Sequence, residues 1–383
     1  MSSTFFKKYK IFTTNFILCG FFDIIQIFPT DCQLFSLIRL TLSTFRSIIV
    51  YGIYFWRYTI LTIKEQLRGL LEENRGEYIS GEEIAKRFYC TRGAVWKAIG
   101  ALRSEGLSIN AVTNRGYCLE NNSDIISEAG IRRYLNTQSE IFVLKKVGST
   151  NAFLREKAQN GACEGTLVVS SEQKNGHGRR GRTFFSPDTG LYMSILLRPK
   201  VEVGEALKIT SMSAVAVCLA LERVCAVKPQ IKWVNDIFVD GKKAAGILTE
   251  ASVDVENGAM DYAVIGIGIN VYPPENGFPE ELSGIAGAVV GERTGDLRNR
   301  LAAAVYEEFM RLYTSSDNAY INEYRNRLMW RGEQIFVLSG ADGREKTLAV
   351  LLGIEDDFSL KVRYENGSCA KITSGEISIG RNL

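Results

Sequence analysis

Histidine is almost absent from this chain of 383 residues, in which His177 is the only one. A zinc site built from several histidines is therefore excluded, because such ligand sets need more imidazoles than the sequence has. Catalysis by a serine–histidine–aspartate triad would have to depend on this single residue. Other side chains must therefore carry most of the chemistry.

Closely spaced cysteines are also missing. The eight cysteines form no Cys-x-x-Cys motif, and the nearest pair, Cys218 and Cys225, lies seven residues apart. This spacing argues against a zinc ribbon or a thioredoxin-type redox centre. We expect buried, reduced thiols in a cytoplasmic protein.

Neither sign of charge is in clear excess, since 46 Lys and Arg residues stand against 43 Asp and Glu residues and the net charge is +3. Any contact with nucleic acid must therefore come from a local basic patch and not from a field of the whole protein. The length is typical of about two to four domains.

Residues 1–60 differ from the rest, with fifteen aromatic residues, six basic residues and two acidic residues. Two apolar stretches, 11–29 and 47–63, approach the length of a membrane span. Asp23 and Arg57 interrupt them, each costing about 3 kcal/mol near the centre of a spanning helix, so we do not expect a membrane anchor. We expect an atypical aromatic-rich extension, with a misassigned start of translation as one explanation. A true start near residue 61 would then need a codon other than AUG, because no second methionine occurs before Met193.

A winged helix-turn-helix domain is predicted over residues 61–125. Apolar residues at helical spacing begin at Ile63, and Ser80 predicts the N-cap of a short helix with Glu83 in the capping-box position. After a turn at 89–91, a second helix is expected from Arg92 to about Ser104, which is helix-turn-helix spacing. Short strands around an Asn-Arg-Gly turn at 114–116 then predict a hairpin wing.

Basic and polar side chains on the second helix and on the wing are typical of a DNA-reading surface. The candidate DNA-binding residues are Thr91, Arg92, Trp96, Lys97, Arg103 and Arg115. The alternative is a small helical packing module with solvated basic residues. The wing favours DNA binding.

The central residues, 126–331, alternate strand-like and helical stretches and predict a mixed α/β domain. The segment Gly-His-Gly-Arg-Arg-Gly-Arg at 176–182 follows a strand at 166–171. Its glycines allow close approach of a ligand, and its arginines can pair with anionic oxygens. It is not a Walker A loop, because no Gly-Lys-Ser/Thr follows, and it is not a Rossmann fingerprint, because the next segment, 191–197, is strand-like. A flexible RNA-contacting tract is the alternative.

Two further segments carry polar residues on strand-like patterns. A hairpin with its turn at Asp240-Gly241 sets Asn235 and Asp236 opposite Lys243, which is costly to bury unless a ligand completes the group. An ordinary surface hairpin is the alternative. The Gly-rich stretch 264–271 ends in an amide, Asn270, and by itself is typical of a core strand.

These motifs, taken in order, resemble those of the biotin protein ligases. They are Ser149-Thr150-Asn151, Gln173 with 176–182, Lys232-Trp233-Val234-Asn235-Asp236 with Lys243-Ala244-Ala245-Gly246, and Gly266-Ile267-Gly268-Ile269-Asn270. With the helix-turn-helix in front, the chain resembles the bifunctional members of that family, the biotin operon repressors. The resemblance covers about residues 61–380.

The resemblance implies a two-step acyl transfer with ATP, Mg²⁺ entering with ATP, and biotin. Biotin and ATP form biotinyl-5′-AMP, and a lysine of the biotin carboxyl carrier protein of acetyl-CoA carboxylase then takes the biotinyl group. The enzyme needs positioning and charge stabilisation and no nucleophile of its own. The same adenylate would act as corepressor of a homodimer on the operator DNA of biotin genes.

The resemblance assigns roles by motif position. Lys243 and Arg179 are the candidate catalytic residues. The candidate biotin-binding residues are Ser149, Thr150, Asn151, Gln173, His177, Gly178, Arg179, Lys243 and Gly246. The candidate ATP-binding residues are Arg179, Arg182, Asn235, Asp236, Lys243 and Asn270.

Three residues depart from the family pattern. His177 replaces a usual Arg or Lys, Val234 a usual Pro, and Phe184 a common Trp. His177 keeps a hydrogen-bond donor, but its charge depends on pH. The other two keep apolar bulk, and we expect them to be tolerated.

Short strands in residues 332–383 predict a small β-barrel. The resemblance implies an SH3-like domain that helps ATP and the carrier protein to bind, with a purely structural cap as the alternative.

Two other functions stay open: a biotin-sensing transcription factor without catalysis, and a lipoate-type ligase. The motifs 176–182 and 232–236 together favour biotin.

Overall fold

The computed structural model describes residues 62–199, 206–253, 260–315, 317–339, 345–373 and 378–380. The prediction for residues 1–60 lies outside them. Within these ranges, no helix is both long and apolar enough to cross a membrane. The six cysteines here are free thiols, but Cys163 and Cys369 are exposed. The expected burial therefore fails for these two, which lie in a turn and on an edge strand of a sheet.

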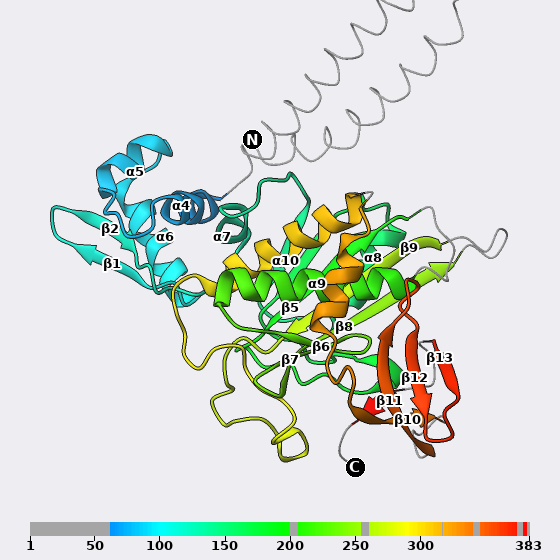
Figure 1. Ribbon diagram of the computed structural model, residues 1–383. Helices are drawn as coiled ribbons and strands as arrows, with labels where there is room; N and C mark the ends of the chain where they lie inside the picture. Colours follow the sequence, from blue (N-terminus) through cyan, green and yellow to red (C-terminus); the bar gives the residue numbers. More distant parts are fainter. Residues whose placement is uncertain are drawn as a thin grey trace, which may run out of the picture. The chain divides into compact units, whose positions relative to one another are not determined.

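Three helices and a two-stranded hairpin make up the first domain (Figure 1). They are α4 (Ile63–Glu73), α5 (Gly81–Arg87), α6 (Arg92–Ser104), β1 (Ile109–Val112) and β2 (Gly116–Leu119). The Ser80 hydroxyl accepts a hydrogen bond from the Glu83 N–H at 3.1 Å, and Thr91 caps α6 by accepting from the Ala94 N–H at 3.2 Å. The predicted helix-turn-helix and wing are confirmed.

The wing is joined to the body of the domain through Ile79. The Ile79 N–H and carbonyl exchange two hydrogen bonds of 2.9 Å with Tyr117 of β2. Gly116 has φ +105°, and a Cβ there would lie 2.0 Å from the Ile79 carbonyl oxygen. Only glycine meets both conditions, which explains the Gly at the end of the predicted turn.

A seven-stranded mixed sheet forms the centre of the chain, in the order β3-β4-β5-β9-β8-β7-β6. Among the neighbouring strands of this sheet that the structure describes, β3 and β4 run parallel and the other pairs run antiparallel. The strands are β3 (Ile141–Leu144), β4 (Leu167–Ser170), β5 (Leu191–Leu197), β6 (Gln230–Lys232), β7 (Asp236–Val239), β8 (Lys242–Val253) and β9 (Met260–Ile269). The helices are α7 (Glu128–Arg132), α8 (Thr150–Gln159), α9 (Ala206–Cys225), α10 (Leu297–Thr314) and α11 (Ala319–Arg327), with short 3₁₀ turns at Arg179–Gly181 and Glu280–Leu282.

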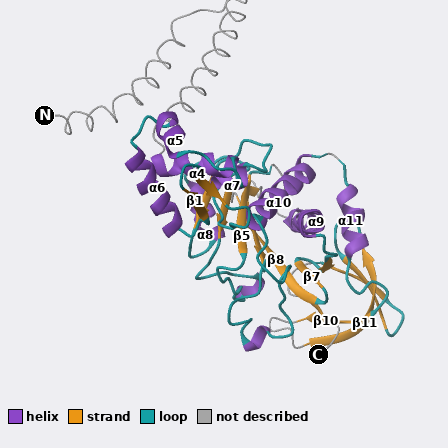
Figure 2. Cartoon of the chain, turned by 90° about the vertical axis from the view of Figure 1, so that its left-hand side faces the viewer, coloured by secondary structure: helices purple, strands orange, loops and turns teal. Residues whose placement is uncertain are grey.

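The two faces of this sheet are covered differently. Figures 1 and 2 show α9 and α10 side by side over one face, where Ile195 and Ile265 join the main core. Their sequence neighbours Leu196 and Val264 point to the other face and pack with Leu154 of α8. Side chains alternate between faces along a strand, so α8 lies opposite α9 and α10.

The last domain is a five-stranded antiparallel sheet in the order β13-β12-β11-β10-β14. Its strands are β10 (Gln334–Ser339), β11 (Glu345–Ile354), β12 (Leu360–Tyr364), β13 (Cys369–Ile372) and β14 (Ser378–Gly380). The predicted strands are confirmed. Among the described residues β13 and β14 are its two edges. The described strands therefore pair as an open sheet and not as the closed barrel that was predicted.

Buried polar groups join the first domain to the central one. Arg75, just after α4, donates to Glu72 at 2.7 Å, to the Ser123 carbonyl at 2.8 Å and to Asp296 at 3.1 Å. Asp296, the N-cap residue of α10, also accepts from Asn299 at 2.6 Å. Because these groups are almost wholly buried, each depends on the others for its hydrogen bonds.

Candidate active site

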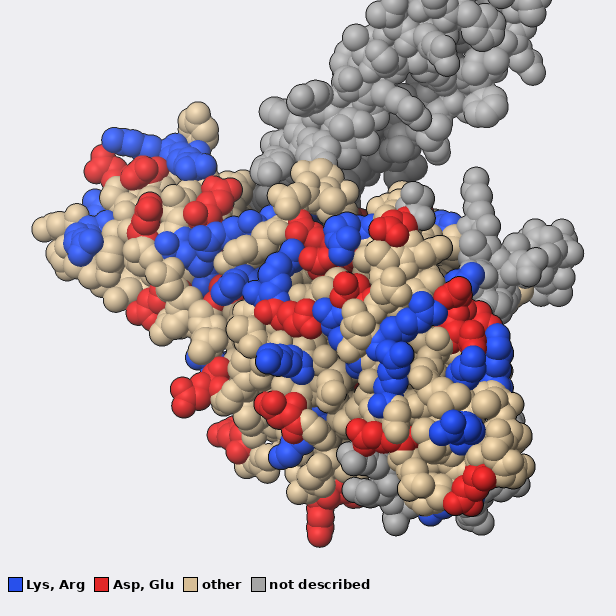
Figure 3. All heavy atoms as spheres, in the orientation of Figure 1, with Lys and Arg blue, Asp and Glu red and all other residues tan. Residues whose placement is uncertain are grey.

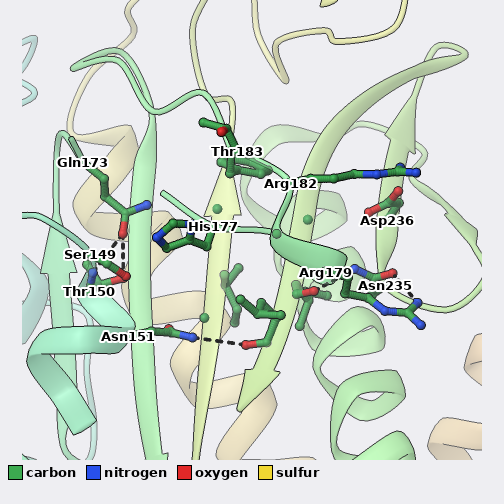
Figure 4. Close-up of a pocket in the computed structure, with 18 of the residues that line it drawn as sticks. Ser149, Thr150, Asn151, Gln173, His177, Arg179, Arg182, Thr183, Asn235 and Asp236 are labelled. Atoms are coloured by element: carbon green, nitrogen blue, oxygen red, sulfur yellow. Dashed lines mark hydrogen bonds between the residues drawn. The ribbon is translucent and has the colours of Figure 1, made fainter. Parts of the chain in front are cut away.

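A cavity of about 540 Å³ lies on the face of the central sheet that carries α8. This size is typical of a site for a small organic ligand. Gly246 of β8 pairs with Gly268 of β9, and Leu248 pairs with Gly266. The missing side chains of these glycines leave room above the strands. Figure 4 shows polar side chains from several elements pointing into this space.

One end of the cavity is polar without an obvious charge. The Gln173 side-chain oxygen accepts from the Thr150 N–H at 2.9 Å and from the Thr150 hydroxyl at 3.1 Å (Figure 4). The Gln173 amide nitrogen lies 3.3 Å from the Ser186 hydroxyl. Ser149 caps α8 by accepting from Ala152, so its hydroxyl proton is left to donate into the cavity.

The other end gathers charge. Arg179 donates to the Asn235 side-chain oxygen at 3.2 Å, and the Lys243 ammonium lies 2.6 Å from the Asp236 carboxylate. Arg182 is exposed and lines the same end. Cationic groups at this density favour anionic oxygens of a ligand.

The structure brings nearly all predicted site residues to one cavity. The lining includes Ser149, Thr150, Asn151, Gln173, His177, Gly178, Arg179, Arg182, Asn235, Asp236, Lys243 and Gly246. Asn270 is the exception. It is buried behind the lining, and its amide nitrogen lies 3.3 Å from the Lys243 carbonyl and 3.2 Å from the Gly287 carbonyl. The geometry makes Asn270 a support for the backbone of Lys243.

Phe184 forms part of the cavity wall. A Cβ at Gly268 would lie 2.6 Å from its ring, and one at Gly246 would lie 3.1 Å from it. The aromatic ring therefore rests directly on the glycine floor. Phenylalanine fills this position with an apolar ring, and the expected tolerance of this departure from the family pattern stays a prediction.

Two lining residues, Glu250 and Arg155, were not predicted from the sequence. The Glu250 carboxylate accepts from the Asn151 amide at 2.7 Å and from Arg155 at 2.6 Å. The bond that the Asn151 amide nitrogen donates to Glu250 fixes which way the amide points, and the Asn151 side-chain oxygen accepts from the Ser194 hydroxyl at 2.6 Å. A signal was present, because Glu250 lies four residues after Gly246 on the same face of β8.

Lys232 also lines the cavity, although the sequence marked it only as part of the motif 232–236. Burial lowers its pKa, with the nearby Asp236 carboxylate opposing the change. Its ammonium lies 5.3 Å from the Trp330 ring centroid. Lys232 therefore adds to the positive potential near Asp236 while its own contacts are with aromatic rings.

The candidate DNA-binding residues divide into two groups. Arg92, Trp96 and Lys97 are exposed on α6, with 68% of Trp96 accessible. Arg115, at the tip of the wing, lies with its guanidinium 4.3 Å from the Tyr78 ring centroid. The face drawn in Figure 3 carries interspersed basic and acidic side chains.

Thr91 and Arg103 have partners within the fold. The Thr91 hydroxyl caps α6, and Arg103 donates to the Ile109 carbonyl from two nitrogens at 2.9 Å and 2.7 Å. Arg103 thus braces the first strand of the wing against α6. Both stay predictions as DNA contacts, with a structural role that the sequence did not indicate.

Sequence comparisons place two known families on the chain. The Biotin/lipoate A/B protein ligase family matches residues 143–270, and the HTH domain matches residues 64–118. The chain is 34% identical over 330 residues to "Bifunctional ligase/repressor BirA" of Bacillus subtilis (strain 168), a match that covers 83% of this chain and 99% of that protein. The protein of the same name from Escherichia coli (strain K12) is 31% identical over 197 residues, covering 51% and 60%.

A solved structure supports the same assignment. The biotin protein ligase from Aquifex aeolicus in complex with biotin and ATP is 27% identical, with a TM-score of 0.53 over 63% of this chain and 99% of that one. Its match and the nearly full-length match to the Bacillus protein agree with the cavity and with the helix-turn-helix. This chain belongs to the family of bifunctional ligase/repressor BirA proteins.

Proposed function

We propose that the protein is an ATP-dependent biotin–[acetyl-CoA-carboxylase] ligase that also represses transcription of biotin genes. The observation that carries this proposal is the division of one cavity into two ends. Ser149, Thr150 and Gln173 offer neutral donors and acceptors that suit the ureido group of biotin. Arg179 and Lys243 offer cations that suit its carboxylate and the phosphates of ATP.

In the first step, a biotin carboxylate oxygen attacks the α-phosphorus of ATP. The bond from that phosphorus to the bridging oxygen breaks, and pyrophosphate leaves with Mg²⁺ that entered with ATP. Lys243 and Arg179 reduce the repulsion between the two anions and stabilise the charge that builds up on the α-phosphate. Asn235, which orients Arg179, and Asp236, which pairs with Lys243, hold these cations in place.

In the second step, the neutral amine of a carrier-protein lysine attacks the acyl carbon of biotinyl-5′-AMP. The acyl–oxygen bond breaks, AMP leaves, and the lysine nitrogen gives up a proton to solvent as the amide forms. The segment 176–182 is proposed to close over the adenylate and to shield its anhydride from water. No nucleophile of this chain is consumed, so a single histidine is sufficient.

The remaining parts of the proposal concern domain organisation and location. We place the helix-turn-helix domain at 61–125, the ligase domain at 126–331 and an SH3-like C-terminal domain at 332–383. The C-terminal domain is proposed to help ATP and the carrier protein to bind. A cytoplasmic location suits a protein that uses ATP and a carboxylase subunit as substrates.

The test is biotin-dependent exchange of labelled pyrophosphate into ATP by the full chain, with a carrier-protein domain added in a parallel reaction to detect covalent biotin. We expect activity in both. Lipoate in place of biotin serves as the control and should support neither. Binding of biotin without exchange would refute the ligase and favour a sensor without catalysis.

The repressor half of the proposal rests on α6 and the wing. Biotinyl-5′-AMP is proposed to favour a homodimer that binds an operator with two half-sites. When carrier protein is abundant, the adenylate is consumed and the operator is released. Occupancy of the DNA would then report the supply of biotin.

Replacing Arg115 by alanine is expected to weaken binding to DNA from upstream of the biotin genes and to lower the slope of log affinity against log salt by about one, because one phosphate contact is lost. Pyrophosphate exchange should not change. Arg311→Ala, which removes an exposed arginine of α10, is the matched control and should leave the slope as it was. An unchanged DNA affinity in Arg115→Ala would show that the wing does not contact phosphate there.

A further inference from the structure

The turn that carries Asn235 and Asp236 is held from outside the cavity. It connects β6 to β7 and contains Trp233, whose indole is only 3% exposed. The indole N–H donates to the Phe358 carbonyl at 2.9 Å. Phe358 lies in the connection between β11 and β12 of the C-terminal domain. A residue of the last domain is thus bonded directly to the motif at the charged end of the cavity.

Phe358 is itself locked in place. Its side chain is wholly buried, and its ring stacks on Tyr320 at 5.7 Å and 15° and meets the edge of Tyr324 at 5.3 Å and 78°. Both tyrosines belong to α11. This aromatic cluster joins α11 to the C-terminal sheet and leaves the Phe358 carbonyl facing Trp233.

Tyr324 makes a second bond to the same turn. Its hydroxyl donates to the Val234 carbonyl at 3.2 Å. Burial raises the pKa of Tyr324 well above its ordinary value, so the hydroxyl keeps its proton and stays a donor. The turn is therefore bonded on one side through the Trp233 indole and on the other through the Val234 carbonyl.

The next two residues set the charged end of the cavity. Asn235 bonds to the Ile247 carbonyl at 2.7 Å and receives Arg179, and Asp236 pairs with Lys243. A shift of the turn would move both cations relative to a bound nucleotide. Displacements of about 1 Å can cost a large factor in rate when reacting groups must be aligned.

We infer that Tyr324 and Phe358 are positioning residues for the ATP half of the reaction. Neither lines the cavity, and both act through the backbone that carries Asn235 and Asp236. This inference rests on the proposed ligase function. It makes α11 and the C-terminal domain supports of the ATP site, with no effect on the polar end at Ser149, Thr150 and Gln173.

The test is Tyr324→Phe in the full chain, which removes the hydroxyl and keeps the ring against Phe358. We expect kcat/KM for ATP in pyrophosphate exchange to fall about tenfold, whereas the KM for biotin stays within about twofold. Hydrogen exchange of the peptide 233–239, measured by mass spectrometry without ligands, should become several-fold faster.

Tyr306→Phe is the matched control. The Tyr306 hydroxyl is also buried and donates to a backbone carbonyl, that of Gly165, at 2.8 Å, but it lies on α10, away from the turn. Tyr306→Phe should lose a similar hydrogen bond, and neither kcat/KM for ATP nor the hydrogen exchange of 233–239 should change. Equal losses in the two variants, equal losses for both substrates, or unchanged exchange of 233–239 in Tyr324→Phe would overturn the inference. Failure of the ligase function would show in the wild-type chain, whereas the 233–239 measurement needs no activity.

Discussion

Replacing Lys243 by alanine is expected to reduce biotin-dependent pyrophosphate exchange on the order of a hundredfold to a thousandfold, the cost of removing one group that stabilises developing charge. The Lys243 ammonium is the cation paired with Asp236 at the charged end of the cavity. The fold should survive, because Asp236 is 24% exposed and can turn to water. Initial rates at saturating biotin and ATP, with a circular dichroism melt beside them, measure both effects.

Lys242→Ala is the control for this variant. Lys242 is the residue of β8 just before Lys243, is exposed, and does not line the cavity. Lys242→Ala removes the same charge within one residue of the site, so any general effect of lost charge should appear in this variant. We expect exchange at the wild-type rate. Normal exchange in Lys243→Ala would refute the role given to Lys243.

Replacing Arg75 by methionine is expected to lower the free energy of unfolding by about 3–5 kcal/mol, the cost of leaving buried carboxylates without their cation. Glu72 and Asp296 are 1% and 5% exposed, and Arg75 bonds to both. Methionine keeps most of the apolar stem. Urea unfolding of the full chain, with the midpoint and slope compared with wild type, measures the loss.

The loss should also depend on pH. Burial raises the pKa of Asp296 to about 6, while Arg75 opposes the change. Between the ordinary carboxyl value and 6 the folded state binds more protons than the unfolded state, so the contribution of this group to stability falls as pH rises. Without Arg75 the pKa of Asp296 rises further, so the contribution of Asp296 to stability continues to fall above pH 6. The difference from wild type should therefore be larger at pH 8 than at pH 6.

An exposed ion pair provides the contrast to this buried one. Lys86 and Glu82 pair at 2.9 Å on α5 with side chains 77% and 64% exposed. Such pairs add little to stability because water and salt screen them. Lys86→Met should leave the urea midpoint unchanged. A midpoint in Arg75→Met equal to that of Lys86→Met would mean that Arg75 does not stabilise the junction of the two domains.

Local patterns in the sequence were sufficient for the helix-turn-helix and for many of the residues that line the cavity. Ser80 begins its helix because its side-chain oxygen, next to the first turn, satisfies a free N–H, which needs no distant partner. The arginines of 176–182 and the polar residues 235, 236 and 243 suggested a ligand site by residue type, whereas the glycines at 266 and 268 alone are typical of a core strand. The family pattern then orders them into one reaction.

Tertiary structure alone decided how these residues are supported. Asn270, predicted as an ATP ligand, lies behind Lys243 and holds its backbone. Arg103, predicted as a DNA contact, braces the wing. The bonds from Phe358 to Trp233 and from Arg75 to Asp296 join residues 125 and 221 positions apart. A contact of this kind depends on how whole elements pack, and no spacing, cap or periodicity in either segment encodes it, whereas the sequence by itself determined the helices, the turns and the chemistry available to the cavity.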